Sequence, residues 1–193
     1  MAQAKADAPV GAAGPLVRRL TLEEAQQLAL ANNPSLTLAR INLMENPTFM
    51  KVTKHLVAAG RALSESSLPT ATQELVKLRA SQINGCGFCT DMHYKDAVEA
   101  GESAERLNMV AAWREATTFT EAERAALELA EQGTRIADAS EGVTDEAWAN
   151  AAKHYDDEQL GALVACIAII NAFNRGNVIT RQPAGDYVAG MFG

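Results

Sequence analysis

Two cysteines and a histidine stand close together in the segment NGCGFCTDMHYKD, residues 84–96. Cys86 and Cys89 form a Cys-x-x-Cys pair, and His93 follows Cys89 after three intervening residues. The chain of 193 residues holds three cysteines and three histidines in all, so composition alone does not explain this clustering. At 100° per residue, the three side chains fall within an arc of about 60° on a helix. The segment therefore predicts one helix face that carries two thiols and an imidazole.

The chemistry that this face offers is thiol chemistry. The thiolate is the reactive form of cysteine, and a helix N-terminus or a neighbouring imidazolium lowers its pKa from about 8.5. Gly85 is expected to end the preceding helix, which places both sulfurs in the next first turn, near unpaired backbone N–H groups. His93, one turn beyond Cys89, can exchange protons with it. Gly87 is expected to leave the backbone open to the close approach of a substrate.

Three other interpretations of the pair have to be weighed. Covalent haem attachment requires Cys-x-x-Cys-His, but Thr90 occupies the position of that histidine, so this interpretation is excluded. Zinc could bind the two thiols and the imidazole with Glu74 or His55 as fourth ligand, although a second ligand pair is missing. Buried cysteines also occur simply as small apolar residues, but that role leaves the imidazole on the same face unexplained.

The remaining cysteine and histidines are expected to take no part in this chemistry. Cys166 lies in the apolar run LGALVACIAIINAFN, residues 160–174, and is predicted to be an inert core residue. His55 and His154 have no partner motif beside them and are predicted to be structural or on the surface. Glu74 lies at the margin of an apolar stripe. Taken alone, this favours a surface carboxylate, with a buried carboxylate of raised pKa as the alternative.

Helix signals recur along the sequence, and no segment alternates apolar and polar residues for long enough to predict a strand. Capping residues, prolines and glycines delimit the expected helices. These are residues 22–32, 47–59, 69–83, 86–100, 103–117, 121–132, 145–155 and 158–175. The closing residues RQPAGDYVAGMFG are expected to be extended and to pack on the surface or on a neighbouring subunit. The prediction is one all-α domain over residues 19–193, after a flexible extension of residues 1–18.

Composition argues against several classes of partner. Lys and Arg total 17 and Asp and Glu total 24, so the formal charge is −7, and no basic run suggests nucleic acid or an anionic membrane. The apolar run of residues 160–174 is shorter than a bilayer span and is predicted to be a buried core helix. No signal peptide is evident, so a reducing cytoplasmic location is expected, where a Cys-x-x-Cys pair is catalytic or metal-binding.

The stretch ELVKLRASQINGCGFCTDMHYKDAVEAGE, residues 74–102, resembles the core of the AhpD-like alkylhydroperoxidases, within the carboxymuconolactone decarboxylase superfamily. Redox-active members of that family carry Glu, eleven residues, Cys-x-x-Cys, three residues and His. Glu74, Cys86, Cys89 and His93 stand at those spacings. The resemblance is specific over about 70–125 and looser over about 40–70 and 120–180, where NAFNRGN, residues 171–177, is also similar.

This resemblance implies a single compact helical bundle that assembles into homotrimers or homohexamers and uses no cofactor or metal. It also implies a peroxidase that reduces hydrogen peroxide or organic hydroperoxides. Cys89 would attack the hydroperoxide, Cys86 would resolve the sulfenic acid as an intramolecular disulfide, and Glu74 and His93 would relay protons. A lipoyl protein or a thioredoxin-like protein would supply electrons. The founding members carry a second histidine between the cysteines, where this chain has Phe88.

Two rival functions follow from the same residues. The first is that of the decarboxylase branch of the superfamily, which acts on a cyclic lactone acid and generally does not depend on a Cys-x-x-Cys pair. The second is a zinc-binding or redox-sensing interaction protein without turnover. The intact thiol pair argues against the first rival, and the absence of a second ligand pair argues against zinc.

Overall fold

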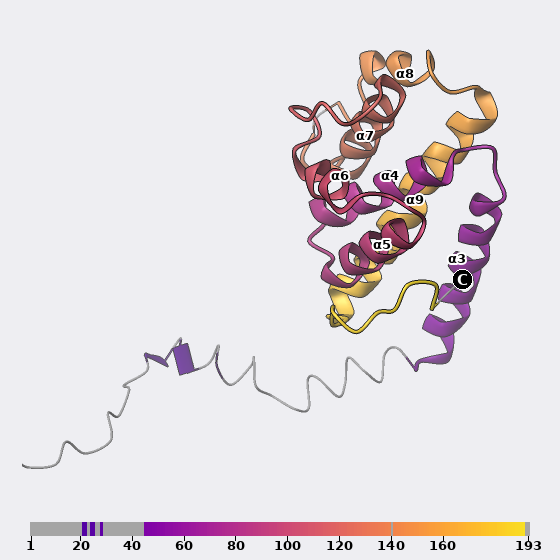
Figure 1. Cartoon of the computed structure of the whole chain (residues 1–193). Coiled ribbons are helices and arrows are strands. Elements are labelled where there is room, and N and C mark those ends of the chain that lie inside the picture. The colour runs from indigo at the N-terminus through magenta and orange to yellow at the C-terminus, as the bar shows by residue number, and fades with distance from the viewer. Residues whose placement is uncertain (1–20, 23, 26–27, 29–44, 140, 192–193) are drawn as a thin grey trace, which may run out of the picture. The chain divides into compact units, whose positions relative to one another are not determined.

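The computed structural model of this chain describes residues 21–22, 24–25, 28, 45–139 and 141–191. Its helices are α3 (Pro47–Ser64), α4 (Thr70–Ile83), α5 (Gly87–Glu99), α6 (Ala104–Asn108), the 3₁₀ helix η1 (Met109–Ala112), α7 (Glu121–Thr134), α8 (Asp145–Ala151) and α9 (Asp157–Thr180) (Figure 1). No strand occurs among the described residues, which confirms the all-α prediction. The chain divides into residues 1–39 and 40–193, and these helices all belong to the second unit. The expected extension of residues 1–18 lies outside the described part.

Side-chain caps start the helices where the sequence predicts them. The Asn46 side chain accepts hydrogen bonds from the first free N–H groups of α3, and Pro47 follows it as the first helical residue. Thr120 forms a capping box at α7, and Asp156 forms one at α9. Thr21 and Glu24 form the predicted capping box, in which each side chain accepts a hydrogen bond from the backbone N–H of the other residue. These helix starts are local events, which is why sequence reasoning finds them.

Helix ends agree less well with the predictions. α3 passes through Gly60, where a Cβ would meet nothing within 4 Å, and continues to Ser64, because one glycine costs a helix only about 1 kcal/mol. α9 likewise passes Gly176 and ends at Thr180, before the C-cap Arg181, whose φ of 55° is left-handed. α8 ends at Ala151, short of the predicted residue 155. The predicted ends of α3, α8 and α9 were therefore wrong by about one helical turn.

The predicted helix of residues 103–117 is also wrong, because it breaks into the short helix α6 and the 3₁₀ helix η1 and ends at Ala112. Beyond Ala112, the guanidinium group of Arg124 donates to the carbonyl oxygens of Trp113, Arg114 and Ala116 at 2.8–3.0 Å. Those carbonyls accept from a side chain of α7, which satisfies them where the chain is no longer helical.

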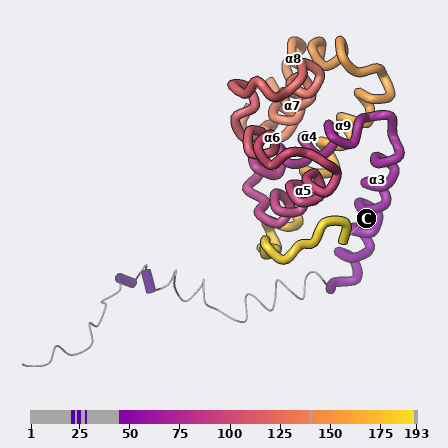
Figure 2. The backbone as a smooth tube through the Cα atoms, viewed as in Figure 1, coloured from indigo at the N-terminus to yellow at the C-terminus, as the bar shows by residue number. Residues whose placement is uncertain are grey.

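α4 and α9 run through the middle of the bundle (Figures 1 and 2). α4 packs against α5, α7 and α9, while α9 also contacts α3, α5 and α7. By length and composition alone, α9 could span a membrane. It contacts four other helices, and its buried residues Leu163, Cys166 and Ile167 join the largest apolar cluster. Only 33% of its apolar stretch is buried, so the predicted buried core helix is buried on one face rather than all round.

Residues 182–191, called the C-terminal segment below, lie along α5. Lys95 Nζ donates to the carbonyl oxygens of Gly185 and Tyr187, each at 2.9 Å. The Tyr187 hydroxyl donates to the Asp96 carboxylate at 2.8 Å. The expected packing of these residues on the surface is confirmed, and their contact is with the helix that carries the thiol pair.

Candidate active site

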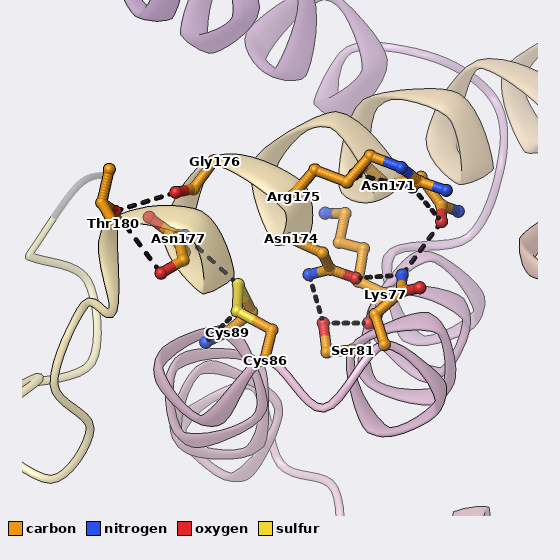
Figure 3. The surroundings of a disulfide bond; sticks show 11 residues. Lys77, Ser81, Cys86, Cys89, Asn171, Asn174, Arg175, Gly176, Asn177 and Thr180 are labelled. Atoms are coloured by element: carbon orange, nitrogen blue, oxygen red, sulfur yellow. Dashed lines mark hydrogen bonds between the residues drawn. A yellow bond between two sulfur atoms is a disulfide. The ribbon is translucent and has the colours of Figure 1, made fainter. Parts of the chain in front are cut away.

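The cysteines lie where α4 turns into α5. Gly85 adopts a φ of 66° after the C-cap Asn84, a left-handed conformation that glycine enters without strain. Cys86 is the N-cap of α5, and its Sγ accepts a hydrogen bond from the Cys89 backbone N–H at 3.3 Å. Both cysteines are buried and are joined to each other in a disulfide (Figure 3). The predicted placement of both sulfurs in the first turn is confirmed.

His93 and Glu74 form a second buried pair. Glu74 Oε2, from α4, lies 2.9 Å from His93 Nδ1, and Lys77 Nζ donates to Glu74 Oε1 at 2.8 Å. The carboxyl group is buried, so the surface position that the apolar stripe favours when taken alone is wrong. Burial alone would raise its pKa, but the hydrogen bond and charge of His93 and the charge of Lys77 lower this pKa from 4.5 to about 2. The raised-pKa alternative is therefore also wrong.

The contact with Glu74 fixes how His93 can use its protons. A carboxylate can only accept, so Nδ1 must carry the hydrogen that it donates to Glu74. The other ring nitrogen, Nε2, is buried. It neither donates nor accepts a hydrogen bond within the described part of the chain. His93 lies one helical turn beyond Cys89 on the buried face of α5. Nε2 is therefore the nitrogen with which this histidine can take up or release a proton.

Three asparagines of α9 face the thiol pair and the turn before it. Asn177 Nδ2 lies 3.3 Å from Cys89 Sγ and donates a hydrogen bond to it (Figure 3). Asn84 Nδ2 donates to the side-chain oxygens of Asn171 and Asn174, at 2.9 and 2.8 Å. Sequence analysis assigned no role to these residues, although asparagines three residues apart in an apolar helix were a signal for one buried polar face.

The C-terminal segment covers the start of α5. A Cβ at Gly87 would lie 3.5 Å from the Cβ of Ala184, so the prediction that Gly87 leaves the backbone open is wrong. Phe88 packs edge-on against the Tyr187 ring, with centroids 6.3 Å apart and the planes at 77°. Phe88 thus supports the cover that the C-terminal segment forms over the site.

The other predicted residues behave as expected. Cys166 is fully buried, and burial raises its thiol pKa to about 12, so it stays protonated and inert. His55 and His154 are exposed. Among the described residues, no group of three or more His, Cys, Asp or Glu is arranged to hold a metal ion. The zinc interpretation therefore finds no ligand set in this part of the chain.

Comparisons with known proteins find a matching family model and similar proteins. The family model named "Carboxymuconolactone decarboxylase family" matches residues 47–132. The uncharacterized protein YdfG of Bacillus subtilis (strain 168) is 45% identical over 111 residues, which cover 58% of this chain and 74% of YdfG. The uncharacterized protein YnjA of Escherichia coli (strain K12) is 33% identical over 119 residues, 62% of this chain and 64% of YnjA.

Solved structures share the fold. A crystal structure from Agrobacterium tumefaciens, of a protein of unknown function described as a candidate antioxidant defence protein AhpD, has a TM-score of 0.69. It is 34% identical and covers 76% of this chain and 97% of that chain. The apo form of the debrominase Bmp8 has a TM-score of 0.63 at 21% identity, over 90% of this chain and 94% of its own. At 21% identity, the similarity to Bmp8 is evidence for a shared fold alone.

Proposed function

This chain belongs to the carboxymuconolactone decarboxylase family as an AhpD-like member, and on that premise we propose that it is a thiol peroxidase. The observation that carries the proposal is the buried face of α5, where the Cys86–Cys89 disulfide and the Glu74–His93 pair lie together. A disulfide between these cysteines is the oxidised product that a peroxidase cycle would leave. A decarboxylase acting on a lactone would give this thiol pair no task.

In the proposed cycle, the Cys89 thiolate attacks the terminal oxygen of a hydroperoxide. The S–O bond forms as the O–O bond breaks, and the departing alkoxide takes a proton from His93 Nε2, which gives a sulfenic acid and an alcohol. Glu74 orients the imidazole and stabilises its charged form. The Cys86 thiol then attacks the sulfenic sulfur, the disulfide forms, and water leaves. Two thiols and one hydroperoxide thus yield a disulfide, an alcohol and water.

A dithiol protein, of the lipoyl or thioredoxin-like kind, would return the disulfide to two thiols. We further propose that the protein works in the cytoplasm as a homotrimer or homohexamer. An exposed apolar surface beside α9 supports an oligomer. There Ile136, Trp148 and Val164 are between 45% and 58% exposed around a groove of about 640 Å³.

Peroxide consumption by the purified protein, with a chemical dithiol or a candidate protein as reductant, tests this function. Cys89→Ser should abolish turnover, and Cys86→Ser should stop after one oxidation because no thiol resolves the sulfenic acid. Cys166→Ala is the matched control and should retain turnover, since this thiol is buried and protonated. Multiple turnover in both Cys86→Ser and Cys89→Ser would refute the mechanism. A single oxidation without turnover in the wild type would identify a redox sensor instead.

A further inference from the structure

The hydrogen bond from Asn177 to Cys89 is not used by the proton relay. Within the part of the chain that the structure describes, each sulfur of the pair accepts from one donor. Cys86 Sγ accepts from the Cys89 backbone N–H, as an N-cap side chain does, and Cys89 Sγ accepts from Asn177 Nδ2. The backbone N–H of Cys89 is therefore committed to the other sulfur. A side chain from another helix supplies the donor that Cys89 lacks.

We propose that Asn177 stabilises the Cys89 thiolate and is a catalytic residue of the peroxidase proposed above, on which this inference rests. Cys89 is fully buried, and burial disfavours a charged sulfur unless a hydrogen bond compensates. A hydrogen bond to a charged acceptor is roughly twice as strong as one to a neutral acceptor. The contact seen with the disulfide thus strengthens once the sulfur is reduced and ionised. An amide does not titrate, so this donor is present at every working pH.

The other two asparagines of α9 bind the turn before the thiol pair and its neighbours on α4. Asn171 and Asn174 accept from Asn84, in the turn before the thiol pair, and Asn174 Nδ2 donates to Ser81 Oγ at 3.1 Å. These bonds tie the last turns of α9 to the junction of α4 and α5. Neither Asn171 nor Asn174 bonds a sulfur through these contacts, so a substitution at Asn174 perturbs this junction without removing a sulfur donor.

The same donor directs the return to the reduced state. When a thiolate of the reductant attacks Cys86 Sγ, a mixed disulfide forms and Cys89 leaves as a thiolate, which accepts the hydrogen bond from Asn177. The second thiol of the reductant then attacks the mixed disulfide and releases Cys86. A better-stabilised leaving thiolate departs faster, so Asn177 favours attack at Cys86 over attack at Cys89.

Alkylation of Cys89 by iodoacetamide as a function of pH tests this role, with Cys86→Ser as the background and mass spectrometry to assign the site. Asn177→Ala should raise the pH midpoint of alkylation by about one unit, which is about a tenfold slower reaction at pH values below both midpoints. Asn177→Asp has nearly the same shape but lacks the amide donor, and should raise the midpoint at least as far. If the alanine variant does not fold, Asn177→Asp tests the same prediction.

Asn174→Ala is the matched control, because this residue belongs to the same set on α9 but does not contact sulfur. It should lower the thermal stability and leave the pH midpoint unchanged. Unchanged midpoints in both Asn177 variants, or an equal shift in Asn174→Ala, would overturn the proposal. The assay uses no peroxide, so an upward shift in a protein without peroxide turnover would refute the peroxidase and retain Asn177 as the thiolate donor.

Discussion

Replacing Glu74 with glutamine removes the negative charge between His93 and Lys77 at nearly constant side-chain volume. The folded protein lowers the pKa of this carboxyl group from 4.5 to about 2. A pKa difference of one unit corresponds to about 1.4 kcal/mol, so the shift amounts to about 3 kcal/mol of stability. The group is well buried, with its side chain 12% exposed, so solvent screens little of this energy.

The stabilisation that ionised Glu74 contributes decreases as the pH falls. Because the pKa is lower in the folded than in the unfolded protein, the stabilisation is complete above pH 4.5 and is lost as the pH falls toward 2. The stability difference between wild type and Glu74→Gln should therefore be largest near pH 7. It should shrink through pH 4 and 3 and vanish near pH 2.

Thermal unfolding followed by circular dichroism measures this difference. For a domain of this size, about 3 kcal/mol corresponds to a melting temperature lower by roughly 6–12 °C at pH 7. Glu115→Gln, at an exposed position, is the control and should change stability by less than about 0.5 kcal/mol. Melting temperatures of wild type and Glu74→Gln that fall in parallel between pH 5 and 2.5 would refute the reasoning.

Two further substitutions probe the turn before α5 and the C-terminal segment. Gly85→Ala should cost about 1–2 kcal/mol in urea unfolding, because φ is 66° there although a Cβ meets no atom within 4 Å. Gly161→Ala, in open space on α9, should be neutral or stabilising, and equal effects of the two changes would contradict a left-handed Gly85. Lys95→Met removes the bonds to the Gly185 and Tyr187 carbonyls and should speed amide hydrogen exchange in residues 182–191. Unchanged exchange there would show that Lys95 does not hold the segment.

The arrangement on α5 could be predicted because it is local. Cys86, Cys89 and His93 share one helix, so the helical repeat alone places them on one face, and all three are buried there. Glu74 Oε2 lies 2.9 Å from His93 Nδ1 although the two residues belong to different helices, and only the family resemblance set them side by side in advance. The burial of Glu74 was harder to predict, because only its partners His93 and Lys77 make a buried carboxylate tolerable.

What sequence reasoning missed depends on long-range contacts. Asn177 and Cys89 are 88 residues apart, and no periodicity within one helix reports which side chain of another helix will meet it. The cover that Ala184 forms over Gly87 was hidden for the same reason. The bonds from Arg124 of α7 to the carbonyls of Trp113 and Arg114 are likewise long-range contacts that no pattern within residues 103–117 reports.

The division of the site between α5 and α9 has a consequence for protein engineering. A designer who transplants NGCGFCTDMHYKD into another helical hairpin would carry over both thiols and the imidazole. The recipient would lack the amide of Asn177 and the carboxylate of Glu74, which come from α9 and α4. The smallest portable unit is therefore a three-helix frame, with α9 included for its asparagines, rather than the continuous motif.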